Sequence, residues 1–413
     1  MSKLRWLVLA VMATAALVFA AGCGGDSGGS GSGGGGGGDK SPIKIGASLP
    51  LTGEFSEPGK AAQQGYEVWK ATVNEKGGIN GRKVELVIKD DASNQNTIVA
   101  DYNALISKDK VDMLLGTFSS LLNLPASAVA ERNRKLYVEP AGGSPEMFSR
   151  GFKHLFFTQQ ATADHQGDVF AKYVTSLPPD QRPKTAAYPT LDDPFAGPTA
   201  EGIEKILKAA GIQTVYKETY TLDVQNFDAI ANSIKAKNPD IVVNGATFED
   251  GVGVVRALDK VGFTPKIMYQ TTAPSLGEQY AKGVGAANTE GVFYAVSHSV
   301  DAKTPGNAEF VAKYKAMYGG AEVPEDAADA FAAAEVLQKA IEEVGSINDQ
   351  TKLADWLRGN KVDTILGPLS WKPDGSPNGE FLVGQWQNGK PEIVLPKAAA
   401  TSDTIVYPYK GGK

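Results

Sequence analysis

Short β-branched runs alternate with amphipathic helical segments along most of this chain, and this alternation is the strongest constraint on its fold. The first series places strands at residues 43–48, 84–90 and 111–116, with helical segments between them. A second series begins at residue 185, after the loop SLPPDQRP at residues 176–183. Alternation of this kind is typical of parallel sheets covered by helices. The sequence therefore predicts an α/β protein with two doubly wound parallel-sheet lobes.

The length and the final third of the chain support two lobes with a cleft between them. A chain of 413 residues is longer than one hydrophobic core usually serves. Residues 308–318 and 326–344 read as helices, and residues 361–394 read as short strands and turns. If these late segments return to both lobes, the chain crosses between the lobes several times.

The first 22 residues have the pattern of an export signal. Lys3 and Arg5 precede an uncharged apolar run at residues 6–21, which is short for a membrane span. The run ends in small residues that lead directly to Cys23, the only cysteine. This arrangement resembles the lipobox of bacterial lipoproteins, which implies cleavage before Cys23 and a lipid on its sulfur. The alternative is an ordinary secretory signal that happens to contain a cysteine.

Residues 23–40 read as a tether, because eleven of the 47 glycines lie between residues 24 and 38. A Gly/Ser-rich tract has no side chains to bury and behaves as a flexible coil. Removal of residues 1–22 changes the formal charge from −6 to −8, since this segment holds two basic residues and no acidic ones. An acidic body disfavours binding to nucleic acid, whose affinity comes largely from phosphate contacts.

Sequence motifs for catalysis and for cofactor binding are missing. The chain contains no GxSxG, HExxH, CxxC or P-loop pattern. His154, His165 and His298 are the only histidines, and they lack the spacing of metal ligands. We therefore expect no enzyme activity, no cofactor and no metal. A hydrolase stays open as an alternative, which would be recognised by turnover of the ligand.

Six segments resemble, in order, those of the leucine/isoleucine/valine-type solute-binding proteins of ABC importers. The resemblance covers nearly all of residues 43–395. The segments are IGASLPLTG at 45–53, GGING at 77–81 with Asp90-Asp91, GTFSS at 116–120, PAGGSP at 140–145, DDPFAG at 192–197 and VDTILGPLSW at 362–371.

The resemblance implies a type I periplasmic binding fold, in which two lobes are joined by three crossovers and close on a ligand by a hinge. It divides the body into four segments. Residues 41–162 are the first part of lobe 1, and residues 163–295 are the main part of lobe 2. Residues 296–380 return to lobe 1, and residues 381–413 supply return strands of lobe 2 and a C-terminal tail.

Ser119 and Ser120 follow a predicted strand that ends at Gly116, and they open the next helix. Hydroxyls and free backbone N–H groups at a helix N-terminus form a receptor for a carboxylate. The alternative is simple capping of the helix by a serine. The resemblance places Ser120 on the residue that grips the ligand carboxylate. It also places Gly142, Gly143 and Ser144 where backbone groups and a hydroxyl face the same ligand.

The opposite lobe is expected to supply Phe195 and Phe248 as apolar walls of the site, together with Thr271. Tyr269 is a further candidate for the apolar wall. Each aromatic residue could instead belong to the core. The resemblance places Pro58 where many relatives have an aromatic residue, so this wall would here be missing or be supplied by Phe55 or Phe118.

A ligand ammonium group would need an acidic residue to balance its charge. The family position for that carboxylate falls within residues 269–272, which contain no acidic residue. Glu249 or Asp193 could substitute, or each could be a solvated or helix-capping group. If neither serves, the ligand is more consistent with an acid that has no α-ammonium group, because a buried unpaired cation is costly.

The sequence therefore predicts a monomeric extracytoplasmic lipoprotein, anchored to the membrane through lipid on Cys23. It would capture an amino acid of the branched-chain type, or a related small carboxylate, for an ABC permease and its ATPase. A receptor that signals through a membrane partner, built on the same clamp, is the alternative.

Overall fold

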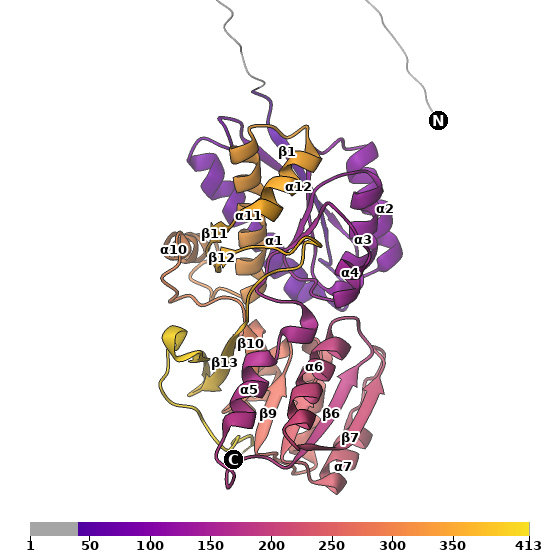
Figure 1. Cartoon of the computed structure of the whole chain (residues 1–413), viewed down its shortest axis with the longest axis vertical. Coiled ribbons are helices and arrows are strands. Elements are labelled where there is room, and N and C mark those ends of the chain that lie inside the picture. Colours follow the sequence, from indigo (N-terminus) through magenta and orange to yellow (C-terminus); the bar gives the residue numbers. More distant parts are fainter. Residues whose placement is uncertain (1–39, 413) are drawn as a thin grey trace, which may run out of the picture. The chain divides into compact units, whose positions relative to one another are not determined.

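The computed structural model describes residues 40–412. The predicted signal, Cys23 and almost all of the predicted tether therefore lie outside the described residues. Within the described part, the elements separate into two lobes, each built around its own sheet (Figure 1). None of the described helices is long and apolar enough to cross a membrane.

The first sheet has five strands in the order β2-β1-β3-β4-β5, and every neighbouring pair is parallel. Strand β1 is buried at every position except Lys44, as expected for a strand covered on both faces. The strands are β1 (Ile43–Leu49), β2 (Val84–Asp90), β3 (Met113–Leu115), β4 (Tyr137–Glu139) and β5 (Leu155–Phe157). The helices of this part are α1 (Ser56–Glu75), α2 (Gln95–Ser107), α3 (Ser120–Arg132) and α4 (Pro145–Ser149).

The second sheet has seven strands in the order β14-β13-β10-β9-β8-β6-β7. Its strands are β6 (Thr185–Leu191), β7 (Gln213–Tyr220), β8 (Ile241–Asn244), β9 (Ile267–Gln270), β10 (Phe293–Val296), β13 (Leu382–Gln387) and β14 (Lys390–Leu395). The helices between them are α5 (Asp168–Ser176), α6 (Ala196–Ala209), α7 (Asp228–Lys237), α8 (Phe248–Lys260) and α9 (Glu278–Val284), with 3₁₀ turns at Ala163–His165, Ala273–Leu276 and Ala286–Asn288.

The second sheet is parallel only from β6 to β10. Strand β13 is antiparallel to both β10 and β14. The turn Asn388-Gly389 joins β13 to β14, and both of its residues have positive φ, as a tight hairpin turn requires. The predicted parallel lobe is therefore a mixed sheet with an antiparallel edge.

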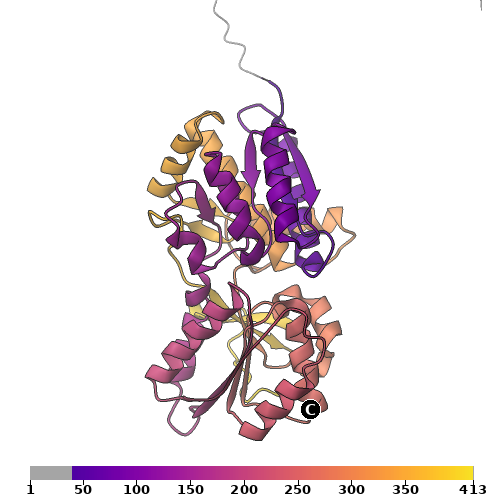
Figure 2. The same cartoon turned by 90° about the vertical axis from the view of Figure 1, so that its right-hand side faces the viewer.

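The C-terminal third returns to the first lobe before its last strands join the second sheet. The returning elements are α10 (Asn307–Met317), α11 (Glu325–Val344), α12 (Gln350–Gly359), β11 (Val362–Thr364) and β12 (Gly367–Leu369). Phe331 and Leu337 of α11 share one buried core with Ile45 and Trp69. The orange helices lie beside the indigo elements in both views (Figures 1 and 2). The chain thus passes three times between the lobes, as predicted.

Helices α1 and α11 pack at very short range. A Cβ added to Gly65 of α1 would lie 2.0 Å from the backbone oxygen of Ala327 in α11. The facing part of α11 is rich in alanine, so small side chains on both helices let the backbones approach. This contact fixes the position of α11 in the first lobe.

We expect Gly65→Ala to lower the free energy of unfolding by about 1–3 kcal/mol, because the added methyl group forces the two helices apart. The matched control is Gly197→Ala in α6, where an added Cβ meets nothing within 4 Å. That change should be neutral or stabilising by up to about 1 kcal/mol. Urea unfolding of both variants checks the expectation, and equal stability would show that the spacing of α1 and α11 is not fixed by Gly65.

Candidate ligand-binding site

A cavity between the two lobes collects residues that follow parallel strands of both sheets. Its space for water-sized molecules is ≈ 60 Å³, several times the roughly 10–15 Å³ that one water requires. Crevices at the carboxyl ends of parallel strands are the usual ligand sites of such sheets. The lining residues are Phe118, Ser119, Ser120, Ala141, Gly142, Gly143, Gln159, Gln166, Asp193, Phe195, Thr247, Thr271, Thr272, Ser275, Ala295, Glu325, Asp326 and Asp329.

The two serines at the start of α3 have different roles. Ser119 caps the helix, since its hydroxyl accepts from the backbone N–H of Leu122 at 3.3 Å. Its φ of 71° is unusual for a residue other than glycine, and such strain is found most often at functional sites. The Ser120 hydroxyl instead accepts from the backbone N–H of Ser144 at 3.0 Å. Ser120 therefore keeps its own proton for donation to a ligand at the positive end of α3.

The loop after β4 brings backbone close to the same end of the cavity. A Cβ on Gly142 would lie 2.8 Å from Asn123 Nδ2, and one on Gly143 would lie 3.1 Å from the ring of Phe157. Beneath the loop, Glu139 is fully buried and one of its oxygens accepts from Ala141 N–H at 2.9 Å. Burial raises the pKa of Glu139 well above its ordinary value. A neutral Glu139 does not repel a ligand carboxylate.

The second lobe contributes Asp193, Phe195 and two threonines. Asp193 Oδ1 accepts from the backbone N–H groups of Phe195 (2.8 Å) and Ala196 (3.1 Å), which sets the turn into α6. Its Oδ2 is buried without a partner among residues 40–412, and burial raises the pKa of Asp193. The hydroxyl of Thr247 bonds Asp250 at 2.7 Å, and that of Thr271 accepts from Ala246 N–H at 2.9 Å. Phe195 is half-buried and forms an apolar part of the wall.

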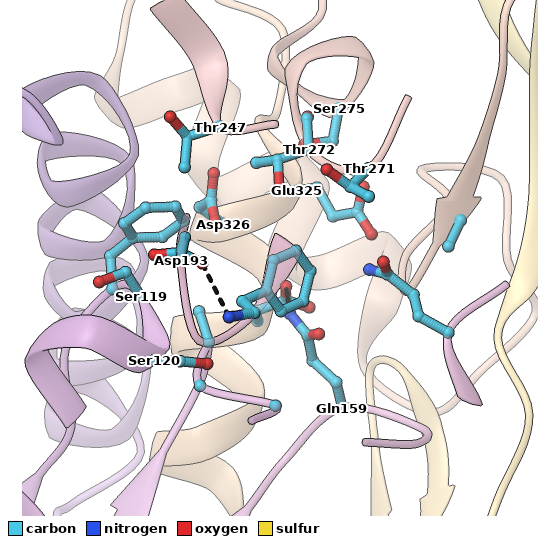
Figure 3. A pocket seen from close by; sticks show the side chains of 18 residues that line it. Ser119, Ser120, Gln159, Asp193, Thr247, Thr271, Thr272, Ser275, Glu325 and Asp326 are labelled. Atoms are coloured by element: carbon cyan, nitrogen blue, oxygen red, sulfur yellow. Dashed lines mark hydrogen bonds between the residues drawn. The ribbon is translucent and has the colours of Figure 1, made fainter. Parts of the chain in front are cut away.

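Three acidic residues at the start of α11, Glu325, Asp326 and Asp329, form another wall. The first two are labelled in Figure 3. The Ser297 hydroxyl lies within hydrogen-bonding distance of Glu325 Oε1 and, at 2.6 Å, of Asp329 Oδ1. The side-chain amide of Gln159 donates to Asp329 Oδ2 at 2.5 Å. Asp326 is only 7% exposed, and its Oδ2 has no partner among the described residues. None of these three acids was predicted as a site residue.

Burial is the main cause of strongly shifted pKa values on this wall. It raises the pKa of Glu325 to about 7 and that of Asp326 to about 8, with the neighbouring Glu325 carboxylate adding to the second shift. The pKa of Asp329 is also raised well above its ordinary value, first by burial and then by Glu325. Much of the wall is therefore protonated near neutral pH when no cation is present.

Six of the predicted site residues line the cavity: Ser119, Ser120, Gly142, Gly143, Phe195 and Thr271. Ser144 lies just behind it and reaches Ser120 through its backbone N–H. Phe248 packs half-buried against the core of the second lobe, and Glu249 is exposed one residue further along α8. These three positions are not part of the lining.

The aromatic residues considered as apolar walls lie in different places. Phe118 lines the cavity, and Phe55 lies behind it with its ring centroid 5.7 Å away. Tyr269 belongs to the core of the second lobe, where its ring centroid lies 4.5 Å from that of Phe170. The lining residues Gln159, Gln166, Thr272 and Ser275 carry no sequence signal that separates them from other loop residues.

The chain matches the model of the periplasmic binding protein family over residues 42–391. The chain belongs to the periplasmic binding protein family. This agrees with the resemblance read from the sequence and with a binding protein rather than an enzyme. It also supports a location outside the cytoplasm, whereas lipid attachment at Cys23 stays a prediction.

Individual relatives agree with this assignment. The chain is 28% identical over 359 residues to the Leu/Ile/Val-binding protein BraC3 of Rhizobium johnstonii, which covers 84% of this chain and 92% of the relative. Two solved structures share the fold at a TM-score of 0.75. One is a leucine-binding protein LivK of Thermotoga maritima, at 23% identity over 85% of this chain and 97% of its own. The other is an ABC transporter solute-binding protein of Rhodopseudomonas palustris in complex with benzoate, at 19% identity over 88% and 99%.

The acidic wall should make the ligand-free protein less stable as the pH rises. The folded-state pKa of Asp326, about 8, lies above the value of about 3.9 expected in the unfolded chain. The folded state therefore holds the proton more tightly, and the free energy of unfolding falls between about pH 4 and pH 8. Asp326→Asn should reduce this fall, because asparagine does not ionise.

Urea unfolding between about pH 5 and pH 8 measures this dependence. The exposed Asp363 of β11 offers a control, and Asp363→Asn should keep the wild-type dependence on pH. A wild-type dependence in Asp326→Asn would show that Asp326 is ionised in the ligand-free protein.

Proposed function

We propose that this protein is the solute-binding component of an ABC importer. It captures an amino acid of the branched-chain type, or a related small carboxylate, outside the cytoplasm and delivers it to a permease driven by an ATPase. The observation that carries the proposal is the start of α3, where Ser120 is the first residue of the helix and lines a cavity between two lobes. The named ligands of the relatives, leucine, isoleucine, valine and benzoate, all carry a carboxylate.

Capture in this proposal proceeds by closure of the lobes around the ligand. The first lobe binds the carboxylate at the N-terminus of α3, where the helix dipole and the hydroxyl of Ser120 act together. Phe195 and the residues around Thr247 then approach from the second lobe and exclude water. Three crossovers join the lobes, so we expect the lobes to close by a hinge motion about these crossovers.

The remaining parts of the proposal concern the segments outside the cavity. Cleavage after residue 22 and lipid on Cys23 would hold a monomer near the membrane through the tether of residues 23–40. The lobe limits at residues 162, 295 and 380 are proposed from the family resemblance. Relatives described as binding proteins and as ABC transporter components favour transport over the sensing alternative.

We expect Ser120→Ala to weaken ligand binding by roughly 1–3 kcal/mol, because a charge-assisted hydrogen bond to the carboxylate is lost. A thermal-shift screen of branched-chain amino acids and aromatic acids selects the ligand, and calorimetry then measures its affinity for each variant. Ser149→Ala serves as the control, since Ser149 is exposed and bonds only Glu146 O. An unchanged affinity in Ser120→Ala would mean that the carboxylate binds elsewhere.

A further inference from the structure

The charge of the cavity is one-sided. Four carboxyl groups line it, Asp193 from the second lobe and Glu325, Asp326 and Asp329 from α11, and no lysine, arginine or histidine is among the described lining residues. A buried carboxylate that lacks a partner is costly, and so is a buried acid forced to ionise beside another. No positively charged side chain among the described lining residues therefore balances these four carboxyl groups.

Asp326 is the residue that most directly indicates what is missing. It is 93% buried, it lines the cavity, and its Oδ2 has no hydrogen-bond partner in the described part of the chain. The side chain stands at the cavity next to Glu325 (Figure 3). Asp193 repeats the same feature across the cavity, because one oxygen accepts hydrogen bonds in the turn into α6 and the other has no partner within the described chain.

Ser297 links the other two acids, which both have hydrogen-bond partners. Its hydroxyl contacts both Glu325 Oε1 and Asp329 Oδ1, but it has only one proton to donate. One of the two contacts therefore requires that the carboxyl group carry the proton.

Two simpler accounts do not explain the wall. Acidic residues in the first turn of a helix favour its dipole, but Asp329 lies beyond the first turn of α11 and is held by Gln159 and Ser297. A bound metal would need a suitable ligand geometry. No three of the His, Cys, Asp and Glu side chains in residues 40–412 are arranged to hold a metal ion. An organic cation is the occupant that fits.

We propose that the start of α11 binds a cationic nitrogen of the solute, with Asp326 as its main acceptor and Glu325 and Asp329 beside it. The solute is then an amino acid with a free α-ammonium group rather than a simple acid such as benzoate. This inference rests on the proposed function and adds the class of ligand to it. The site differs from those considered from the sequence, where the family position within residues 269–272 holds no acid and Glu249 or Asp193 were the possible substitutes.

The proposal assigns both charges of the amino acid to the first lobe. The α-carboxylate binds at the N-terminus of α3, and the α-ammonium group binds at the start of α11, which the return segment brings to the same cavity. Asp193 and Phe195 of the second lobe complete the site when the lobes close. The open first lobe can therefore distinguish an amino acid from a simple acid before closure.

Binding of a cation should release protons and should tighten as the pH rises from about 6 to 8. The carboxyl groups that face the cation are Glu325, Asp326 and Asp329 on α11 and Asp193 on the second lobe. The nearby His298 donates its backbone N–H to Glu325, and burial lowers its pKa to about 4, so its ring stays neutral in this range.

Calorimetry on the full chain, in buffers of different ionisation enthalpy, tests the proposal. Leucine is compared with 4-methylpentanoate, phenylalanine with 3-phenylpropanoate, and benzoate is added. The second member of each pair lacks only the α-amino group. The amino acid should bind at least about tenfold tighter than its partner and should release protons near pH 7, whereas the partner should release none.

Asp326→Asn should weaken the binding of the amino acid by at least about tenfold and remove most of the proton release. The affinity for the deaminated acid should stay unchanged. Glu249→Gln is the matched control, because Glu249 is an exposed acid near the cleft and outside the lining, and it should behave as wild type. Glu325→Gln provides a second variant at the wall, with the same expected loss of proton release, should Asp326→Asn fold poorly.

The outcomes separate this inference from the proposed function. If benzoate or a deaminated acid binds as tightly as the amino acids, the ammonium site is rejected and a carboxylate-binding importer component stands. Amino acid binding that is unaffected by both wall variants also rejects the site. If no amino acid or carboxylic acid binds, both the inference and the proposed function are rejected.

Discussion

The close packing of α11 on α1 determines where the C-terminal third of the chain lies, and the cavity depends on it. Gly65 leaves no room for a side chain against the backbone of Ala327, so the two helices are held at one spacing. Glu325 and Asp326 stand at the start of the same helix. A contact that completes the core of the first lobe thus also positions an acidic wall, about 200 residues along the chain from the serines that it faces.

Most of the fold could be predicted from local pattern, because strand and helix periodicity are short-range signals. The pattern GTFSS indicated a strand followed by a helix start, and the structure places Ser119 and Ser120 there at the cavity. The mixed edge of the second sheet was missed, since the direction of a strand depends on its partner rather than on its own residues. The turn at Asn388 carried the only local sign of it.

The site residues were predictable where a single sequence motif contains them. They were not predictable where residues from distant segments of the chain meet. Glu249 was considered as a ligand group but is exposed, while its neighbour Asp250 points inward and closes the capping box of α8. Successive residues on a helix point about 100° apart, so a shift of one residue decides whether a side chain is exposed or buried. Glu325, Asp326 and Asp329 read as ordinary acids of a helix start. Only the return of α11 to the first lobe makes them neighbours of Ser297 and Gln159.

The three passages of the chain between the lobes have a consequence for synthesis. All five strands of the first sheet leave the ribosome before any strand of the second, but α10, α11 and α12 follow only after β10. The first lobe is therefore discontinuous, and its core stays open while the second lobe is being made. A nascent chain that ended after β10 would contain every strand of the first sheet and would still lack α11, which completes the core beside α1. Completion of the first lobe therefore depends on segments that are made after the parallel strands of the second lobe.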